Sequence, residues 1–123
     1  MILNCIIVAA GGGLGALSRY LFGFIPVKVV GDFPLSTLII NLAGSFLIGF
    51  VVSISGKILG PKTILFFKTG FCGGFTTFST FSLENMLLIQ SGHYATVALY
   101  MFLSFAVCLA GCFGGFAIAG KLW

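Results

Sequence analysis

Long apolar stretches separated by short polar connections account for nearly the whole chain. Four of these stretches are long enough to cross a bilayer, which takes roughly 20 apolar residues in a helix. The predicted spans are residues 3–24, 33–54, 64–90 and 94–122, and the connections are residues 26–32, 55–62 and 91–93. Because these connections leave no room for a soluble domain, the pattern predicts an all-α membrane protein with four transmembrane helices in one domain, residues 1–123.

Composition supports a membrane location. Hydrophobic residues make up 59% of the chain and charged residues only 7%, whereas a soluble domain carries about 25% charged residues. The formal charge of +4 does not indicate nucleic-acid binding, because the basic residues mostly lie near predicted helix ends, where they anchor helices at lipid headgroups. Trp123 is expected to be another interfacial anchor. The four cysteines match no zinc or redox spacing, and we interpret them as packing residues, with Cys108 as the one exception considered below.

The distribution of basic residues encodes orientation weakly. Four spans would place both chain termini on one side of the membrane. That side would hold four basic residues and the other side two: Lys57, Lys62, Lys68 and Lys121 against Arg19 and Lys28. An excess of Lys and Arg marks the cytoplasmic side, and this excess is small. A chain that inserts both ways could form an antiparallel dimer, and tagging each terminus tests this hypothesis, since a single topology would exclude it.

Glycine pairs with a spacing of four residues occur in three of the predicted spans: Gly11 with Gly15, Gly70 with Gly74, and Gly111 with Gly115. In lipid, small residues at this spacing let helices approach each other closely. The glycine-rich run at 11–15 is not a nucleotide-binding fingerprint, which needs a preceding strand and a following acidic residue. We therefore predict that these glycines lie at contacts between helices.

Polar side chains form one stripe on each of two predicted spans. The members of a stripe are four residues apart and so share a helix face. They are Thr37, Asn41 and Ser45 in the second span, and Thr96, Tyr100, Ser104 and Cys108 in the fourth. Any one of them alone would be explained by a hydrogen bond to another helix or to its own backbone. Two stripes in so short a chain favour the wall of a polar path.

The third predicted span contains the most specific pattern in the chain, residues 70–82, where glycines, hydroxyls and aromatic rings occur together. Gly73 and Gly74 predict a break in the helix, since glycine costs about 1 kcal/mol in a helix interior. Non-helical backbone within a membrane is tolerated only where protein buries it or where it lines a pathway. Carbonyl oxygens freed between Gly73 and Thr76 would suit a small cation or a capping water.

Two kinds of side chain follow the predicted break. Thr76 and Thr80 share one helix face, and Phe78 and Phe81 share another. Phenylalanine is usually core filling, and this chain has fifteen of them. However, an aromatic ring has a positive edge, so a ring presented edge-on can stabilise an anion without a formal charge.

The charged residues favour an anion as the species that would follow such a path. The only acidic residues are Asp32, predicted in a loop, and Glu84, late in the third span. A cation pathway usually shows acidic side chains. Glu84 is open to two interpretations, as a residue near water at the end of a span or as a functional intramembrane acid. Neutral donors together with Arg19 and Lys68 indicate a small anion.

Three motifs together identify a family resemblance. They are residues 12–20 (GGLGALSRY), residues 37–46 (TLIINLAGSF) and, above all, residues 70–82 (GFCGGFTTFSTFS). In this order and at this length, the chain resembles the Fluc (CrcB) fluoride channels over its whole extent. The resemblance implies a passive, fluoride-selective channel of the cell inner membrane, not an enzyme. It also implies an antiparallel, dual-topology homodimer with two pores. A structural sodium ion would lie at its centre, held by the backbone carbonyls of Gly73 and Thr76 from both subunits.

The same resemblance implies roles for individual residues. Phe78 and Phe81 would present their ring edges to fluoride, and Asn41 would be the pore amide. The polar tracks would contain Thr37, Ser79, Thr80, Tyr100 and Ser104. Cys108 stands where a hydroxyl residue would extend the track, and a thiol is a weaker donor. Arg19 and Glu84 would belong to the vestibule, where a positive charge raises the local concentration of anions.

Three other interpretations remain at this point. A proton-coupled exporter of the small multidrug type also has four short helices in an antiparallel dimer, but it depends on an acid in its first helix, and residues 3–24 contain none. A structural membrane subunit would explain the glycines but not two polar stripes beside a broken helix. One subunit of an obligate heterodimeric fluoride channel would fit the same motifs.

Overall fold

The computed structural model describes residues 1–26 and 31–122. The described residues are helical and contain no strand; two residues of the connection before α3, Ser55 and Leu59, form an isolated bridge. The helices are α1 (Ile2–Phe22), α2 (Leu35–Ser53), α3 (Pro61–Ile64), the π-helix η1 (Leu65–Phe71), α4 (Cys72–Phe75), α5 (Phe78–Gln90) and α6 (Tyr94–Leu122). Lys28 and Trp123, for which the sequence predicts membrane-interface positions, lie outside the described residues.

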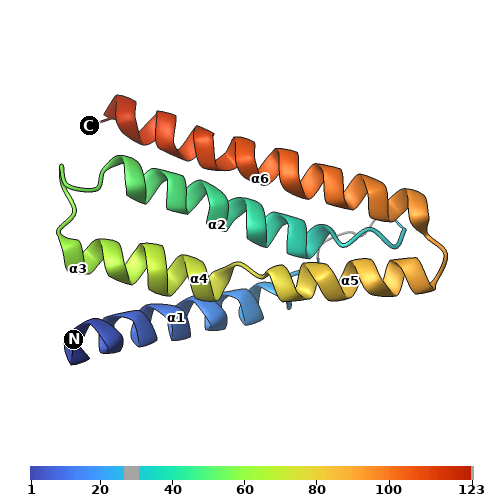
Figure 1. Cartoon of the computed structure of the whole chain (residues 1–123), viewed down its shortest axis with the longest axis horizontal. Coiled ribbons are helices and arrows are strands. Elements are labelled where there is room, and N and C mark those ends of the chain that lie inside the picture. The colour runs from blue at the N-terminus through green and yellow to red at the C-terminus, as the bar shows by residue number, and fades with distance from the viewer. Residues whose placement is uncertain (27–30, 123) are drawn as a thin grey trace.

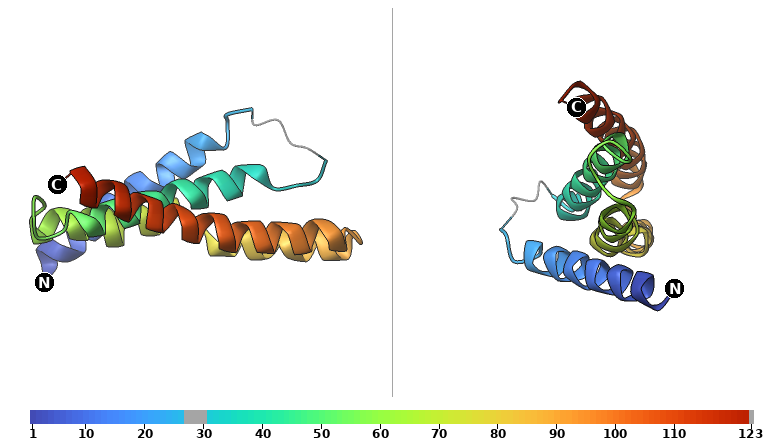
Figure 2. Two further views of the ribbon diagram at one scale, coloured as in Figure 1. Left: turned by 90° about the horizontal axis from the view of Figure 1, so that it is seen from above. Right: turned by 90° about the vertical axis from the view of Figure 1, so that its left-hand side faces the viewer.

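Among the described residues, three helices are long and apolar enough to cross a membrane: α1 with 21 residues, α2 with 19 and α6 with 29. The third predicted span does not form one helix. It is divided among α3, η1, α4 and α5, which follow one another in a row from Pro61 to Gln90 (Figure 1). The two chain ends lie at the same end of the molecule (Figures 1 and 2). The structure is that of an all-α membrane protein.

Two helix pairs dominate the packing. The α2 helix lies along α6, and α1 lies along η1 and α4, whereas α1 and α2 hardly touch (Figure 2). A Cβ at Gly15 would collide with the carbonyl of Phe71, and a Cβ at Gly74 with that of Gly12. A Cβ at Gly115 would likewise collide with the carbonyl of Phe46. The predicted role of the glycines at close helix contacts is therefore confirmed, because at these points the backbones touch.

The position predicted for the helix break is wrong by two residues. Helix α4 continues through Gly73 and Gly74, and the chain becomes extended at Thr76 (ψ 158°) and Thr77 (φ −148°, ψ 114°) before α5 begins. Gly74 stays in the helix, where the absence of a side chain lets its backbone lie directly against Gly12 of α1. The break falls where other groups in the fold take over the hydrogen bonds of the backbone, and these groups belong to the site described below.

The most deeply buried apolar cluster joins α2, α5 and α6. It contains Leu38, Leu88, Val97 and Tyr100, and Tyr100 is completely buried. Many large apolar side chains elsewhere are exposed. An apolar surface of this extent is typical of contact with lipid or with another protein.

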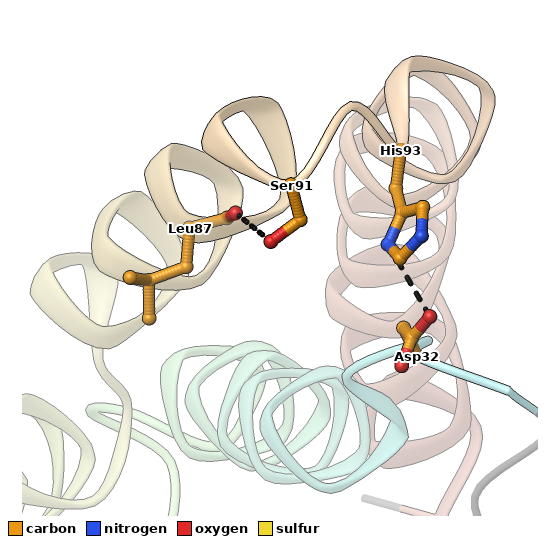
Figure 3. A network of polar contacts seen from close by, with 4 residues as sticks. All are labelled: Asp32, Leu87, Ser91 and His93. Carbon is orange, nitrogen blue, oxygen red and sulfur yellow. Dashed lines mark hydrogen bonds and ion pairs between the residues drawn. The ribbon is translucent and has the colours of Figure 1, made fainter.

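Two polar contacts lie where α5 is followed by α6 (Figure 3), at the end of the molecule away from the termini (Figure 1). The His93 Nδ1 atom lies 3.2 Å from a carboxylate oxygen of Asp32, and both side chains are partly exposed. The Ser91 hydroxyl donates to the Leu87 carbonyl at 2.9 Å and so caps the last turn of α5. Gly92, with φ of 77°, makes the turn that leads into α6.

Candidate ion pathway

The break between α4 and α5 is held by one amide side chain from α2. Asn41 donates from Nδ2 to the carbonyl of Thr77 at 3.1 Å, and the Thr77 backbone N–H donates to Asn41 Oδ1 at 2.8 Å. Thr77 is 6% exposed, so its backbone groups have no access to bulk water. Asn41 therefore satisfies the Thr77 N–H, which has no helical acceptor at the break, and gives a second donor to the Thr77 carbonyl, which as the N-cap of α5 accepts the first bond of that helix. One N–H of its amide remains for another partner.

Thr77 also starts the second half of the broken span. Its Oγ1 accepts a hydrogen bond from the backbone N–H of Thr80 at 3.2 Å, which is a helix N-cap. The same hydroxyl donates to Thr80 Oγ1 at 3.0 Å and lies 3.2 Å from Ser79 Oγ. Sequence reasoning singled out Ser79 and Thr80 but overlooked Thr77. A threonine three residues before another hydroxyl residue at a helix start is the signal that could have found it.

These two contacts leave specific carbonyl oxygens without their usual donors. In a continuous helix, the carbonyl of Gly73 would accept from the N–H of Thr77, and the carbonyl of Thr76 from the N–H of Thr80. Here the Thr77 N–H is taken by Asn41 and the Thr80 N–H by the Thr77 hydroxyl. The structure thus diverts the donors of the two carbonyls for which the family resemblance implies a sodium ion. The Thr76 side chain turns back and donates to the Cys72 carbonyl at 2.8 Å.

A second polar cluster surrounds Glu84 on α5. The Thr37 hydroxyl donates to Oε1 at 2.6 Å, and the Tyr100 hydroxyl donates to Oε2 at 2.7 Å. These distances are typical of charge-assisted O–H···O⁻ bonds. The carboxylate thus joins α2, α5 and α6, and each of the two hydroxyls uses its only proton on it. The Tyr100 ring also lies 5.0 Å from the ring of Phe81, centroid to centroid, so the cluster continues into the phenylalanine pair.

An open groove of about 760 Å³ lies beside the break. Its walls come from α2, η1, α4, α5, α6 and the break. Predicted site residues in its lining are Asn41, Gly73, Thr76, Phe78, Phe81, Ser104 and Cys108. It also contains Ser45, whose side chain lies next to the Cys108 thiol. Two members of each predicted stripe, Asn41 and Ser45 of α2 and Ser104 and Cys108 of α6, therefore meet in one groove. Within the part of the chain that the structure describes, the groove has no acidic lining, and its one cation is Lys68.

The groove presents two kinds of group to a possible occupant. The Phe78 and Phe81 rings lie 5.5 Å apart at an interplanar angle of 38°, and Phe78 is 77% exposed. The Ser104 hydroxyl oxygen is buried and has no hydrogen-bond partner among residues 1–26 and 31–122. A neutral hydroxyl donor without a partner and a ring pair can together bind an anion weakly.

Some predicted residues lie away from the groove. Thr37, Ser79, Thr80 and Tyr100 are in the contacts described above, not in its lining. Glu84 lines a smaller cavity of about 240 Å³ that also contains His93 and Asp32. Arg19 lies in the last turn of α1 and lines neither cavity. The two phenylalanine rings and part of each stripe lie in the groove, whereas Arg19 and Glu84, the residues predicted for the vestibule, do not line it.

Comparison with known proteins assigns the family. Residues 6–116 match the family described as CrcB-like protein, Camphor Resistance (CrcB). A protein of Azobacteroides pseudotrichonymphae named fluoride-specific ion channel FluC is 43% identical over 115 residues, covering 91% of this chain and 90% of that protein. Proteins of the same name from Agrobacterium fabrum and Leptospira interrogans are 40% and 44% identical, covering 98% and 95% of this chain and 99% and 91% of their own lengths.

The chain belongs to the CrcB family.

The resemblance stated from the three motifs is thereby confirmed, and the relatives are named as ion channels, not as enzymes. The region that matches the CrcB family, residues 6–116, contains every residue predicted for the pathway and for the metal. Family membership also removes the small multidrug exporter as an interpretation of this chain.

Proposed function

We propose that this CrcB protein is a passive, fluoride-selective ion channel of the cell inner membrane that lets fluoride leave the cytoplasm. The observation that carries the proposal is the groove, in which neutral donors and a ring pair meet and to which the described residues contribute no acidic side chain. The names of its relatives support the choice of fluoride among the anions. The second half of the third span, α5, completes a fourth crossing in this proposal, with the break at Thr76 and Thr77 within the membrane.

The physical problem for such a channel is dehydration. A small anion holds its water tightly, and an unpaired ion in hydrocarbon is very costly. Fixed groups must therefore replace the lost water along the whole path. The free hydroxyl of Ser104, the remaining amide proton of Asn41 and the edges of Phe78 and Phe81 supply such groups. Because none of them is charged, they bind the ion weakly enough to release it.

The Glu84 cluster positions one of the two rings in this proposal. Its carboxylate orients the Tyr100 hydroxyl, and the Tyr100 ring lies against Phe81. Thr37 orients the other carboxylate oxygen. A carboxylate with both oxygens engaged repels a passing anion less than a free one would, because its charge is partly compensated by two donors. Glu84 would therefore fix the orientation of the Phe81 ring through Tyr100 and would not bind fluoride itself.

The proposed assembly is an antiparallel homodimer with two pores around a sodium ion. The carbonyls of Gly73 and Thr76 fit this ion, because the hydrogen bonds that would normally engage them are diverted, and hard cations bind oxygen ligands. Two carbonyls from each of two copies make four, which requires a two-fold axis through the ion. The sodium ion would link the helix break of one subunit to the helix break of the other. The exposed apolar side chains offer surface for the second copy.

Fluoride efflux from liposomes tests the function directly. The purified protein should release fluoride down its gradient without a proton gradient or an added substrate, and chloride should not follow. Phe81→Ile should reduce the fluoride efflux strongly. Phe113→Ile is the matched control, because Phe113 is 69% exposed on α6 and does not line the groove. Vesicles that contain folded dimer but pass no fluoride would contradict the proposal.

A further inference from the structure

Three of the four cysteines line the groove, although none of their thiols takes part in the hydrogen bonds of the break. Cys108 and Cys112 come from α6 and are half-buried, and Cys72 comes from α4 and is buried. The fourth, Cys5, is exposed on α1 and does not line the groove. All four are free thiols. The chain therefore places soft sulfur ligands on the wall of the proposed anion path.

The spacing of Cys108 and Cys112 suits one shared ion. Residues four apart on a helix have Cβ atoms about 5–6 Å apart and lie on the same face, and both residues line the same groove. A metal–thiolate bond is about 2.3 Å long, as for zinc, so two sulfurs at this separation can reach an ion between them. Residues 1–26 and 31–122 contain no group of three histidine, cysteine, aspartate or glutamate side chains that could hold a metal ion together. A third protein ligand from these residues is therefore absent, and a zinc site, which takes four ligands, does not fit.

We propose that Cys108 and Cys112 form a two-thiol site for a soft metal ion such as Hg²⁺, Ag⁺ or Cu⁺, and that an ion bound there blocks the groove. Soft thiolate ligands select soft metals, and these ions accept two-coordinate geometry. In the binding step, two S–H bonds are replaced by two S–metal bonds, and both protons pass to water. No electron is transferred, so no oxidant or reductant is needed.

The location of Cys108 and Cys112 explains why a metal ion bound there would block the passage of fluoride. Cys108 continues the stripe of Ser104 on α6 and lies beside Ser45 of α2, so the bound ion would sit between the two polar stripes. A conduit passes an ion only if each binding site along it is weak. A fixed cation would hold an anion strongly and also narrow the path. This part of the inference rests on the proposed channel function, whereas metal binding itself does not.

Metal binding is tested on the purified protein in detergent. Mercury(II) acetate is titrated into the protein, and bound mercury and remaining free thiols are counted. Once one thiol has bound the ion, the second thiol is held near it at a high effective concentration. Two thiols therefore bind the ion about 100-fold or more tightly than one thiol does. Cys112→Ser and Cys108→Ser should therefore each raise the half-saturating mercury concentration by about 100-fold or more. Cys5→Ser is the matched control and should leave the tight site unchanged. Equal binding by Cys112→Ser and the unmodified protein would overturn the site.

Block is tested by fluoride efflux from liposomes loaded with the same proteins. Mercury should stop efflux through the unmodified protein, dithiothreitol should restore it, and Cys112→Ser should require about 100-fold or more mercury for the same block. Efflux that continues while the two-thiol site is saturated would overturn the blocking role. Vesicles that pass no fluoride before mercury is added would contradict the proposed function, while the mercury count would still decide the site.

Discussion

Removing the amide of Asn41 should destabilise this protein, because this side chain holds the break. Asn41→Ala leaves the Thr77 N–H without its acceptor, at 2.8 Å in the structure, and removes the side-chain donor to the Thr77 carbonyl, at 3.1 Å. That carbonyl keeps a partner, because the carbonyl of an N-cap residue accepts the first bond of its helix. Thr77 is 6% exposed, and an unsatisfied buried polar group costs about 1–3 kcal/mol.

The measurement is unfolding of the purified protein in mixed micelles, followed by circular dichroism as denaturing detergent is added. Asn41→Ala should lower the free energy of unfolding by about 1–3 kcal/mol. Ser45→Ala is the matched control, since Ser45 lies one turn further on the same stripe and makes no hydrogen bond to Thr77. This substitution should lower the free energy of unfolding by less than about 1 kcal/mol. If Asn41→Ala and Ser45→Ala unfold alike, the idea that this amide holds the break is refuted.

Three further predictions concern packing, the Glu84 cluster and sodium. Gly15→Ala should lower the free energy of unfolding, because a Cβ there meets the Phe71 backbone, whereas Gly13→Ala should not, because a Cβ at Gly13 meets nothing within 4 Å; equal effects in the same unfolding assay would contradict the close contact. Tyr100→Phe removes one donor to Glu84, which should cost about 1.5–3 kcal/mol as a bond to a charged group and reduce fluoride efflux; unchanged stability would show that the bond contributes nothing. Replacing sodium by N-methylglucamine should lower the thermal stability of the dimer, and identical melting in both salts would argue against a structural sodium.

Local spacing was enough to predict much of this protein. The glycines at intervals of four correctly indicated helix contacts, because a helix places such residues on one face and lipid favours close approach at small residues. The two stripes likewise indicated one polar groove, and Asn41, Ser104 and Cys108 line it. In each case the relevant information lies within a few turns of a single helix.

The exact place of the helix break depended on partners distant in the sequence. Glycine propensity pointed to Gly73 and Gly74, and the structure breaks at Thr76 and Thr77. The partner that decides this, Asn41, is 36 residues away from Thr77. The propensity cost of about 1 kcal/mol for a glycine in a helix is outweighed by the two hydrogen bonds between Asn41 and Thr77 and by the packing of Gly74 against α1.

The sequence by itself determined the class of the protein, its apolar spans, its family and the residue types available to an anion. Only the tertiary structure decided which of these residues share a site. It joined Thr37, Glu84 and Tyr100 across three helices, kept Arg19 away from the groove, and diverted the hydrogen bonds of the Gly73 and Thr76 carbonyls. The physical reason is that periodicity fixes the face of a helix on which a side chain lies, whereas packing between helices fixes what that face meets.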